Sequence, residues 1–400
     1  MSQVHPKRPA AFIASEAQAL AVARELAAGF RQHASRRDRD RELPHAELAM
    51  LFASGLGAMT VPSRFGGVGL STWALTQVIA ILSEADAALG QVPQNHFYAL
   101  EVLRVNGTEP QQQRLYREAL SGVHLGNALA EFGSPAAHQR NTTVLPDKQG
   151  WRLNGRKFYA TGALYADRIP TAARDAEGKE QLVFVPRHQP GVTVIDDWSG
   201  FGQRTTGSGT VIFEEVAVQE EDIVAFQSAF ERPTAVGPFA QIMHAAIDQG
   251  IARAAFGDML DFIKRLARPW PDSGVENAHE DPLLIDRVGQ MAVRLEAGDA
   301  LLEAASEAVD MAQRQPDAQS VAEASIQVAA ARGWTTESSL AAANLLFELS
   351  GTRAALSEHN LDRHWRNART HTLHDPVRWK YPIIGDYVLN GTLPPRRGTL

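Results

Sequence analysis

The stretch FGQRTTGSGTVIFEEVAV, residues 201–218, marks the middle of the chain as a β region. Its first half is rich in Gly, Thr and Ser, and its second half carries the β-branched and aromatic residues that favour strands. Further strand-like runs occur at 181–187 and 191–198, and turn residues rather than a helical repeat separate them. This arrangement predicts an antiparallel sandwich or barrel over residues 122–236.

Two neighbouring segments of this region have features that suit a turn or a ligand. WRLNGRKFYATG, residues 151–162, contains an Asn-Gly pair, so we expect two short strands joined by a tight turn there. GNALAEFGS (126–134) and KFYATGA (157–163) place small residues beside polar ones, which allows backbone N–H groups to approach a flat or phosphorylated ligand. Ordinary β-turns explain these segments equally well. The loop 201–210 is likewise either a polar binding loop or a hairpin connection.

On both sides of the β region the sequence becomes helical. Apolar residues recur at helical spacing, with Ser caps before the first and third helices and Gly57 and Gly90 as helix stops. The predicted helices are 15–32, 45–57, 71–90, 109–121, 240–267, 282–313, 317–350 and 377–390. The last four predict a four-helix bundle. The fold class is therefore α+β, with an N-terminal helical domain at 1–121, the β domain at 122–236 and the bundle at 237–400.

Composition narrows the class of function. The 400 residues include no cysteine, which excludes disulfides, thiolate catalysis, zinc–cysteine sites and iron–sulfur clusters. A net charge of -7 argues against a nucleic acid partner. No run of about 18 apolar residues suggests a membrane span, and the start of the chain has no long apolar run, so we expect a cytoplasmic protein. No dinucleotide-binding, P-loop or nucleophile-elbow motif occurs.

The segment RNARTHTLHDPVRWKY, residues 366–381, concentrates polar chemistry near the end of the chain. His371 and His374 lie three residues apart and would share one face of a helix. A metal site is not expected because no third ligand follows at helical spacing. Two interpretations remain: a buried structural histidine, or a proton or hydrogen-bond donor beside a cofactor. The tryptophans of the chain are expected in its core; they include Trp198, Trp270, Trp334, Trp365 and Trp379.

In their order and spacing, these segments resemble the acyl-CoA dehydrogenase superfamily over essentially the whole chain. LAEFG (129–133) resembles the family's Thr-Glu-Pro-Gly loop, NGRKFYAT (154–161) its Asn-Gly strand, and GQRTTGSGTVIFEEVAV (202–218) its Gly-Gln-Arg turn and strand. Several motifs resemble the flavin monooxygenase branch of the dibenzothiophene type, and still more closely the sulfur-acquisition oxidoreductases found with sulfone-utilisation genes. They include GQVPQNHFYALEVLR, ARPW and LDRHWRNARTHTLHDPVRWKY.

The resemblance implies roles for particular residues. His374 would give a hydrogen bond or a proton to the oxygen that reduced flavin activates, with His371 in support. Asp375 stands where the dehydrogenases have their catalytic Glu, but it is one methylene shorter and Pro376 follows it. Thr161 would contact the flavin ring. The cofactor-binding residues implied are Asn95, Asn127, Ala128, Leu129, Ala130, Glu131, Phe132, Lys157, Phe158, Tyr159, Ala160, Thr161, Trp198, Arg268, Thr352, Arg353 and His374.

Among these residues, Arg268 would reach the flavin phosphate from a neighbouring subunit, and Thr352 with Arg353 would form another phosphate contact. The dibenzothiophene type has His at the position of Gln91 and Tyr at that of Asn95. These departures imply a smaller or more polar substrate.

The resemblance implies a homotetrameric two-component monooxygenase for a small organosulfur compound. It would use O2 and reduced FMN from a separate flavin reductase; FAD is the second choice of cofactor. No nucleic acid, membrane or metal partner is expected. One alternative is an FAD-dependent acyl-CoA dehydrogenase with Asp375 as base. Another is a non-catalytic flavin-binding partner.

Overall fold

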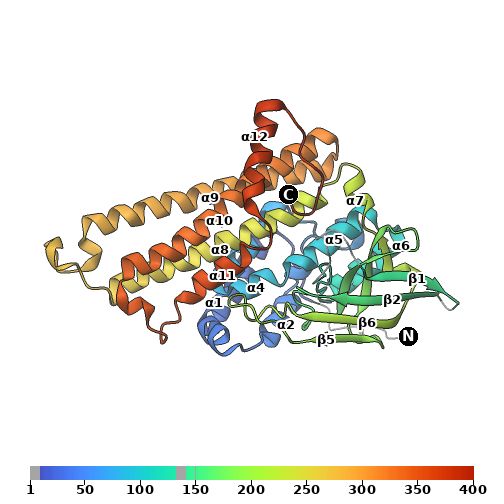
Figure 1. The fold of residues 1–400 in the computed structure, drawn as a ribbon, viewed down its shortest axis with the longest axis horizontal. Helices are drawn as coiled ribbons and strands as arrows, with labels where there is room; N and C mark the ends of the chain where they lie inside the picture. Colours follow the sequence, from blue (N-terminus) through green and yellow to red (C-terminus); the bar gives the residue numbers. More distant parts are fainter. Residues whose placement is uncertain (1–9, 132–140, 149) are drawn as a thin grey trace.

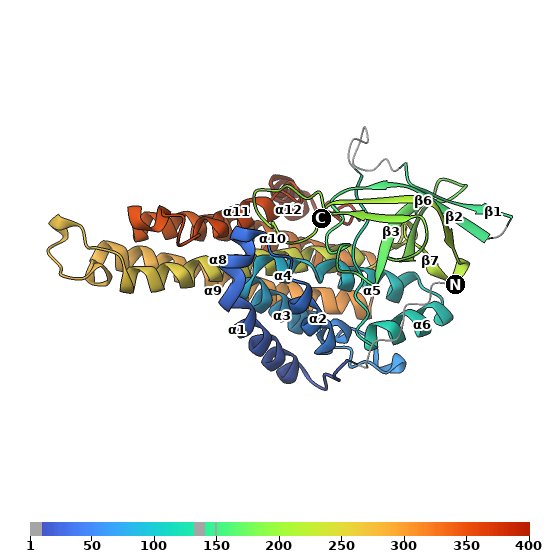
Figure 2. The same cartoon turned by 90° about the horizontal axis from the view of Figure 1, so that it is seen from below.

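Three groups of elements follow one another in the computed structural model, which describes residues 10–131, 141–148 and 150–400. Helices come first, a sheet follows, and long helices complete the chain. In Figure 1 the sheet lies at the lower right, the long helices extend to the left, and the N-terminal helices lie between them. Figure 2 shows the same separation of sheet and long helices from below. The predicted α+β fold class is confirmed.

The N-terminal helices begin at the predicted caps. The Oγ atoms of Ser15 and Ser71 accept hydrogen bonds from backbone N–H groups of the first turns of α1 and α3, which satisfies donors that a helix start leaves unpaired. The helices of this group are α1 (Glu16–Asp40), α2 (His45–Ala53), α3 (Thr72–Ala85), α4 (Ala87–Gln91), α5 (Gln94–Asn106) and α6 (Glu109–Leu120).

Predicted helix boundaries were wrong at three places, and the first helix continues to Asp40 instead of ending at residue 32. The helix expected over 71–90 is interrupted at Asp86, whose carboxylate caps α4 and also pairs with the buried guanidinium of Arg37. These contacts hold Asp86 in extended backbone, which ends α3. The helix expected over 45–57 stops at Ala53, because Gly55 takes a left-handed conformation before Gly57 is reached.

The middle of the chain forms one seven-stranded sheet in the order β5-β6-β2-β1-β3-β4-β7. The predicted antiparallel pairing is found except between β1 and β3, which are parallel. The strands are β1 (Thr143–Asp147), β2 (Gly150–Lys157), β3 (Arg168–Arg174), β4 (Glu180–Pro186), β5 (Val192–Ile195), β6 (Thr210–Val218) and β7 (Ile223–Ala225).

The Asn-Gly pair does not form the predicted turn. Asn154 and Gly155 lie inside β2, where the register against β6 shifts, as a β-bulge does. The side-chain amide of Asn154 bonds both the backbone N–H and the carboxylate of Glu215 on β6. Gly155 has φ +153, and a Cβ there would lie 2.4 Å from Oγ1 of Thr142. Glycine is therefore required by the bulge rather than by a hairpin.

After the short helix α7 (Ser228–Glu231), the long helices pack side by side. They are α8 (Val236–Arg265), α9 (Pro282–Arg314) and α10 (Ala318–Ser350). The short α11 (Asp362–His371), which the sequence did not mark as a separate helix, packs on α8 and α10. The predicted helix 377–390 is α12 (Lys380–Asn390), which packs on α10 and stands above the bundle in Figure 1.

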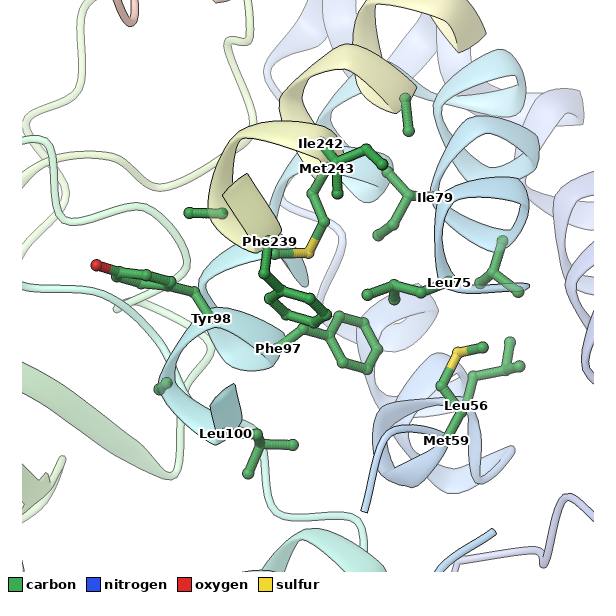
Figure 3. Close-up of a cluster of buried hydrophobic side chains, with 14 of the residues drawn as sticks. Leu56, Met59, Leu75, Ile79, Phe97, Tyr98, Leu100, Phe239, Ile242 and Met243 are labelled. Carbon is green, nitrogen blue, oxygen red and sulfur yellow. The ribbon is translucent and has the colours of Figure 1, made fainter. Parts of the chain in front are cut away.

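The N-terminal helices and the start of α8 share one hydrophobic core. Figure 3 shows where three helices and the turn at 56–59 meet. The labelled side chains are Leu56, Met59, Leu75, Ile79, Phe97, Tyr98, Leu100, Phe239, Ile242 and Met243. Because burial of such side chains contributes about 1.5–3 kcal/mol each, this core fixes the first turns of α8 and so the residue that follows Met243, His244.

Candidate active site

Thr161 lies in a wall of hydroxyl groups on the sheet side of the site. Its Oγ1 is 2.8 Å from Oγ of Ser208, which is 2.7 Å from Oγ1 of Thr206. Tyr159, two residues earlier, has the left-handed φ of +57, and its exposed ring packs edge-on against Trp198. A polar surface edged by aromatic rings is suited to a flat heterocycle with polar edges.

The loop before β6 joins this wall to α11. The backbone N–H of Gln203 donates to Oδ1 of Asn367 on α11 at 2.7 Å. The carbonyl of Gln203 accepts from the indole N–H of Trp198 and from the hydroxyl of Thr206, both at 2.9 Å. One hydrogen-bonded network therefore runs from Thr161 to the helix that ends at His371. The network thus links Thr161 to α11, the helix that carries His371.

Residues 125–131 form the edge of the same wall. The backbone of Ala128 exchanges hydrogen bonds with β3, and Nδ2 of Asn127 donates to the carbonyl of Tyr159 at 3.3 Å. Leu129 is partly buried and Ala130 exposed. These positions fit the implied contact with a ring. Phe132 lies outside the residues that the structure describes.

Glu131 and Lys157 form a buried pair with each other. The Lys157 ammonium is fully buried and 2.7 Å from the Glu131 carboxylate. Burial would raise the pKa of Glu131, but Lys157 and the backbone N–H groups of Asn141 and Thr142 lower that pKa to about 2. The pair therefore braces residues 129–131 against β2. The side chains of these two residues pair with each other, and their contact with a ligand stays a prediction.

A chain of imidazoles lies between α8 and the end of α11. Nδ1 of His371 is 2.5 Å from Oδ1 of Asp248, and Nε2 of His371 is 3.0 Å from Nδ1 of His244. The ring of His244 packs against that of His374, with 4.1 Å between centroids. His371 is therefore a buried, hydrogen-bonded histidine, as the structural interpretation predicts. Through His244 it also belongs to the group that contains His374, the residue expected to act as the donor. His244 and Asp248 were not predicted.

His374 is the accessible member of this group. It follows α11 in a turn, and its side chain is 45% exposed, whereas that of Asp375 is 3% exposed. Nδ1 of His374 lies 3.4 Å from Oδ2 of Asp375. Burial would raise the pKa of Asp375, but the His374 contact and the charges of Arg332 and Lys380 outweigh it and lower that pKa below its usual range. Asp375 is thus an ionised support for His374.

The junction of α4 and α5 closes a third side. A Cβ on Gly162 would touch Val92, so this junction lies directly against the residue after Thr161. Gln91 and Asn95 flank Val92 and are half-buried. Oε1 of Gln91 is buried without a hydrogen-bond partner. The positions that depart from the dibenzothiophene type therefore lie beside the hydroxyl wall.

The implied phosphate contacts lie elsewhere. Arg268, Thr352 and Arg353 line an open groove of about 870 Å³, and Arg353 also donates to the carbonyl of Leu266 at the end of α8. In Figure 1 the end of α8 and the start of α9 form the far left tip of the bundle, away from the sheet. Within one chain these residues do not meet Thr161 or His374.

The polar atoms around the site fit a flavin. Buried atoms without a hydrogen-bond partner include Oδ1 of Asn127, both amide atoms of Gln203, Oγ1 of Thr370 and Oε1 of Gln91. Such atoms are rare in proteins, and a ligand often satisfies them. An isoalloxazine ring carries several donors and acceptors along its edge and can supply these partners.

Three tryptophans differ from the expectation of burial. Trp270 and Trp379 are exposed and Trp365 is about 39% exposed. Trp365 stacks on Phe201 from the loop before β6, with an interplanar angle of 21°. Trp270 lies at the tip, Trp379 directly before α12 and Trp365 on the surface of α11, so residue type alone predicted their burial wrongly.

Two absences concern only the described parts of the chain. Within residues 10–131, 141–148 and 150–400, no helix is long and apolar enough to cross a membrane. Over the same ranges no group of three His, Asp or Glu side chains has the arrangement of a metal site, although three histidines lie together.

Comparisons with known proteins show the family and the fold. Family profiles match three successive parts: the acyl-CoA dehydrogenase N-terminal domain at 14–123, the middle domain at 128–216 and the C-terminal domain at 242–379. Dibenzothiophene monooxygenase of Mycolicibacterium goodii is 32% identical over 93% of this chain and 94% of that protein. The probable FMNH2-dependent monooxygenase SfnC of Pseudomonas putida is also 32% identical, over 94% and 96%.

Solved structures extend the likeness to three dimensions. FMN-bound TdsC from Paenibacillus sp. A11-2 matches with a TM-score of 0.91 and 30% identity, over 96% of this chain and all of that chain. Methanesulfinate monooxygenase MsuC from Pseudomonas fluorescens matches with a TM-score of 0.88 and 31% identity, over 95% and 99%. A putative acyl-CoA dehydrogenase of Bacillus subtilis is only 24% identical.

Proposed function

The chain belongs to the acyl-CoA dehydrogenase family, and from that premise we propose that it is an FMN-dependent monooxygenase of a small organosulfur compound. The observation that carries this proposal is the half-exposed imidazole of His374, supported by an ionised Asp375 and facing a site with unpaired buried amides. That arrangement provides a positioned proton or hydrogen-bond donor beside a flat ring. Relatives of nearly the same length are named as monooxygenases.

Each side of the site has a task in this function. Reduced FMN, when bound, supplies the electrons that activate O2. Thr161, oriented by Ser208, offers a hydroxyl at the ring edge, and Asn127 offers its amide oxygen. His374 donates a hydrogen bond or a proton where negative charge develops on oxygen, which lowers the barrier electrostatically. Trp198 and Tyr159 exclude water from the other edge.

The structure does not favour the dehydrogenase alternative. In that reaction Asp375 would have to reach a substrate proton as a base. Its carboxylate is almost fully buried and directed at His374, so a substrate cannot approach it without displacing the imidazole. Asp375 is therefore assigned a supporting role.

The substrate class follows from the third side of the site. Gln91 and Asn95 put amides beside the hydroxyl wall, where the dibenzothiophene type has His and Tyr. Amides favour a compact ligand with its own hydrogen-bonding atoms, such as an alkyl sulfinate or sulfone, over a fused aromatic ring. The methanesulfinate activity named for MsuC is of this class.

Partners and location complete the proposal. The enzyme takes reduced FMN from a separate flavin reductase and works in the cytoplasm, where reduced flavin can be supplied. It forms a tetramer in which the tip residues Arg268, Thr352 and Arg353 bind the FMN phosphate of another subunit, because guanidinium groups suit phosphate. Mass photometry tests the assembly: a monomer at working concentration would contradict this part.

The function is tested by anaerobic loading with reduced FMN, followed by rapid mixing with O2 and with methanesulfinate or dibenzothiophene. We expect an absorbing species distinct from reduced and oxidised flavin, and oxygenated product from the sulfinate. Thr161→Val should shorten the lifetime of that species, whereas the matched Thr161→Ser should preserve it. Direct return to oxidised flavin without product from either compound would exclude the monooxygenase, and bleaching of bound FAD by an acyl-CoA would favour the dehydrogenase.

A further inference from the structure

A buried relay leads from the interior to the candidate site and has no role in the function proposed so far. His371 is hydrogen-bonded to Asp248 on one side and to His244 on the other. All three side chains are almost fully buried. They come from α8 and from the end of α11, two helices that pack directly on each other. The outer member, His244, contacts the ring of His374.

The hydrogen bonds determine where each proton lies. Asp248 is held by Arg332 and accepts from the hydroxyl of Thr336 at 2.9 Å. Burial would raise the pKa of Asp248, but Arg332 and His371 lower it, so the carboxylate is ionised and can only accept. Nδ1 of His371 must therefore carry a proton. A neutral His371 then accepts at Nε2, so Nδ1 of His244 must also carry a proton.

The neutral state of both imidazoles has a physical cause. Burial lowers the pKa of His371 even though Asp248 raises it. Burial and the nearby His374 lower the pKa of His244 well below its ordinary value. His244 is thus left with an unprotonated Nε2. Among the described residues, no hydrogen-bond partner is found for that atom.

Charged groups surround the relay on every side that packs against it. From α8 comes Asp248, from α10 Arg332, from α11 His371, and from the following turn and α12 come His374, Asp375 and Lys380. Two buried cations therefore oppose a second positive charge near His244. Of the two imidazoles in the relay, His371 is the one that has a carboxylate beside it, so a positive charge added to the relay is more stable on His371.

We propose that Asp248, His371 and His244 form a proton relay that positions His374 and stores one proton beside it. This inference rests on the proposed monooxygenase function. A proton binds Nε2 of His244, the Nδ1 proton of His244 passes to Nε2 of His371, and the positive charge comes to rest beside Asp248. In the reverse sequence, Nε2 of His371 returns its proton to Nδ1 of His244. His244 then releases the proton on Nε2.

The first test reads the tautomers directly and needs no activity. Protein labelled with ¹⁵N at histidine is examined by two-dimensional NMR at neutral pH, and His244→Gln and His371→Gln assign the signals. We expect both residues to carry their proton on Nδ1, whereas the neutral side chain of free histidine favours Nε2. Protonation of either residue on Nε2 alone would overturn the relay, whatever the protein catalyses.

The second test uses a variant that reverses the hydrogen bonds. Asp248→Asn keeps the shape but offers an N–H to Nδ1 of His371, because Arg332 and Thr336 both donate to the other oxygen position and so require the amide oxygen there. His371 and His244 should then both carry their proton on Nε2. We expect product formation to fall about 100-fold, within the range for acid–base catalysis, with a displaced pH profile.

The matched control is His364→Gln. His364 is also buried on α11 and pairs with an aspartate of α8, Asp258, but outside the site. Its removal should leave the tautomers of His244 and His371 and the pH profile unchanged. His244→Gln provides a variant that keeps Asp248 and Arg332 paired; an unchanged pH profile in that variant would overturn the positioning role. Melting temperatures of all variants separate this outcome from loss of folding.

Discussion

Two histidine–aspartate pairs join α8 to α11, and only one of them reaches the candidate site. His371 and Asp248 lie at 2.5 Å and are fully buried. His364 and Asp258 lie at 2.8 Å, but the Asp258 side chain is 29% exposed and also binds Arg363. The outer pair is therefore partly open to solvent at its carboxylate, whereas the inner pair is enclosed and continues into His244.

The comparison teaches that residue type and spacing do not decide the role of a histidine. Both pairs use the same two antiparallel helices and the same chemical partners. The carboxylate of each pair also binds an arginine, but the imidazole of the inner pair bonds a second imidazole, that of His244, which contacts His374. Loss of a hydrogen bond also costs more free energy at the inner pair, because a buried group that loses its partner cannot bond water instead.

The largest expected effect is on the free energy of unfolding. Its absence would contradict the contrast between the inner and the outer pair. Asp248→Ala leaves the fully buried Arg332 without its carboxylate, so the free energy of unfolding should fall by about 3–5 kcal/mol. Asp258→Ala, at the partly exposed pair, should lower it by only about 1 kcal/mol. Denaturant unfolding at neutral pH measures both. Equal losses would mean that the two pairs are energetically alike.

A third buried histidine, His96, sharpens the comparison because its ring nitrogens bond backbone groups instead of a carboxylate. Nε2 of His96 donates to the carbonyl of Gly57, and Nδ1 accepts from the N–H of Leu125. Burial lowers the pKa of His96 to about 4, against an ordinary value of 6.5. The unfolded chain therefore binds this proton first as pH falls, and stability should drop by about 3 kcal/mol between pH 6.5 and pH 4.

The measurement is the free energy of unfolding against pH for the unaltered chain and for His96→Gln. The variant keeps a donor and an acceptor but has nothing to titrate, so its slope over this window should be smaller. Identical slopes would remove His96 as the cause of acid sensitivity.

His374→Ala tests the accessible end of the inner network. Loss of the donor should lower the rate of substrate oxygenation by about 100-fold, in the range for a general acid. FMN binding, followed by fluorescence, should change little, since the ring contacts lie on the sheet side. Loss of FMN binding with an unchanged turnover of bound enzyme would instead make His374 a binding residue.

The smallest effect is expected at the outer pair. His364→Gln can still bond Asp258, so the free energy of unfolding should fall by only about 1 kcal/mol. Oxygenation should be unchanged. A loss of activity comparable to that of His374→Ala would show that the outer pair also serves the site.

Much of the fold could be predicted because its signals are local. Ser15 and Ser71 mark helix starts through capping chemistry that acts over three residues. The Asn154–Gly155 pair misled because the same dipeptide suits a tight turn and a bulge. Only the Glu215 contact and the approach of Thr142, both set by tertiary structure, distinguish the two.

The site was predicted in part for the same reason. His371 and His374 were visible because both are polar, close in sequence and set among other polar residues. His244 and Asp248 stand one helical turn apart in the buried first half of α8, and this i, i+4 spacing of polar residues was the available signal. Their link to His371 spans more than a hundred residues, which no local pattern encodes.

The distance between the tip groove and His374 within one chain has a genetic consequence. Under the proposed assembly, each site takes His374 from one subunit and Arg268 from another. A chain lacking one of these residues and a chain lacking the other are each inactive alone. Expressed together in one cell, they would assemble some sites that hold both residues, and two null alleles of one gene would then complement each other.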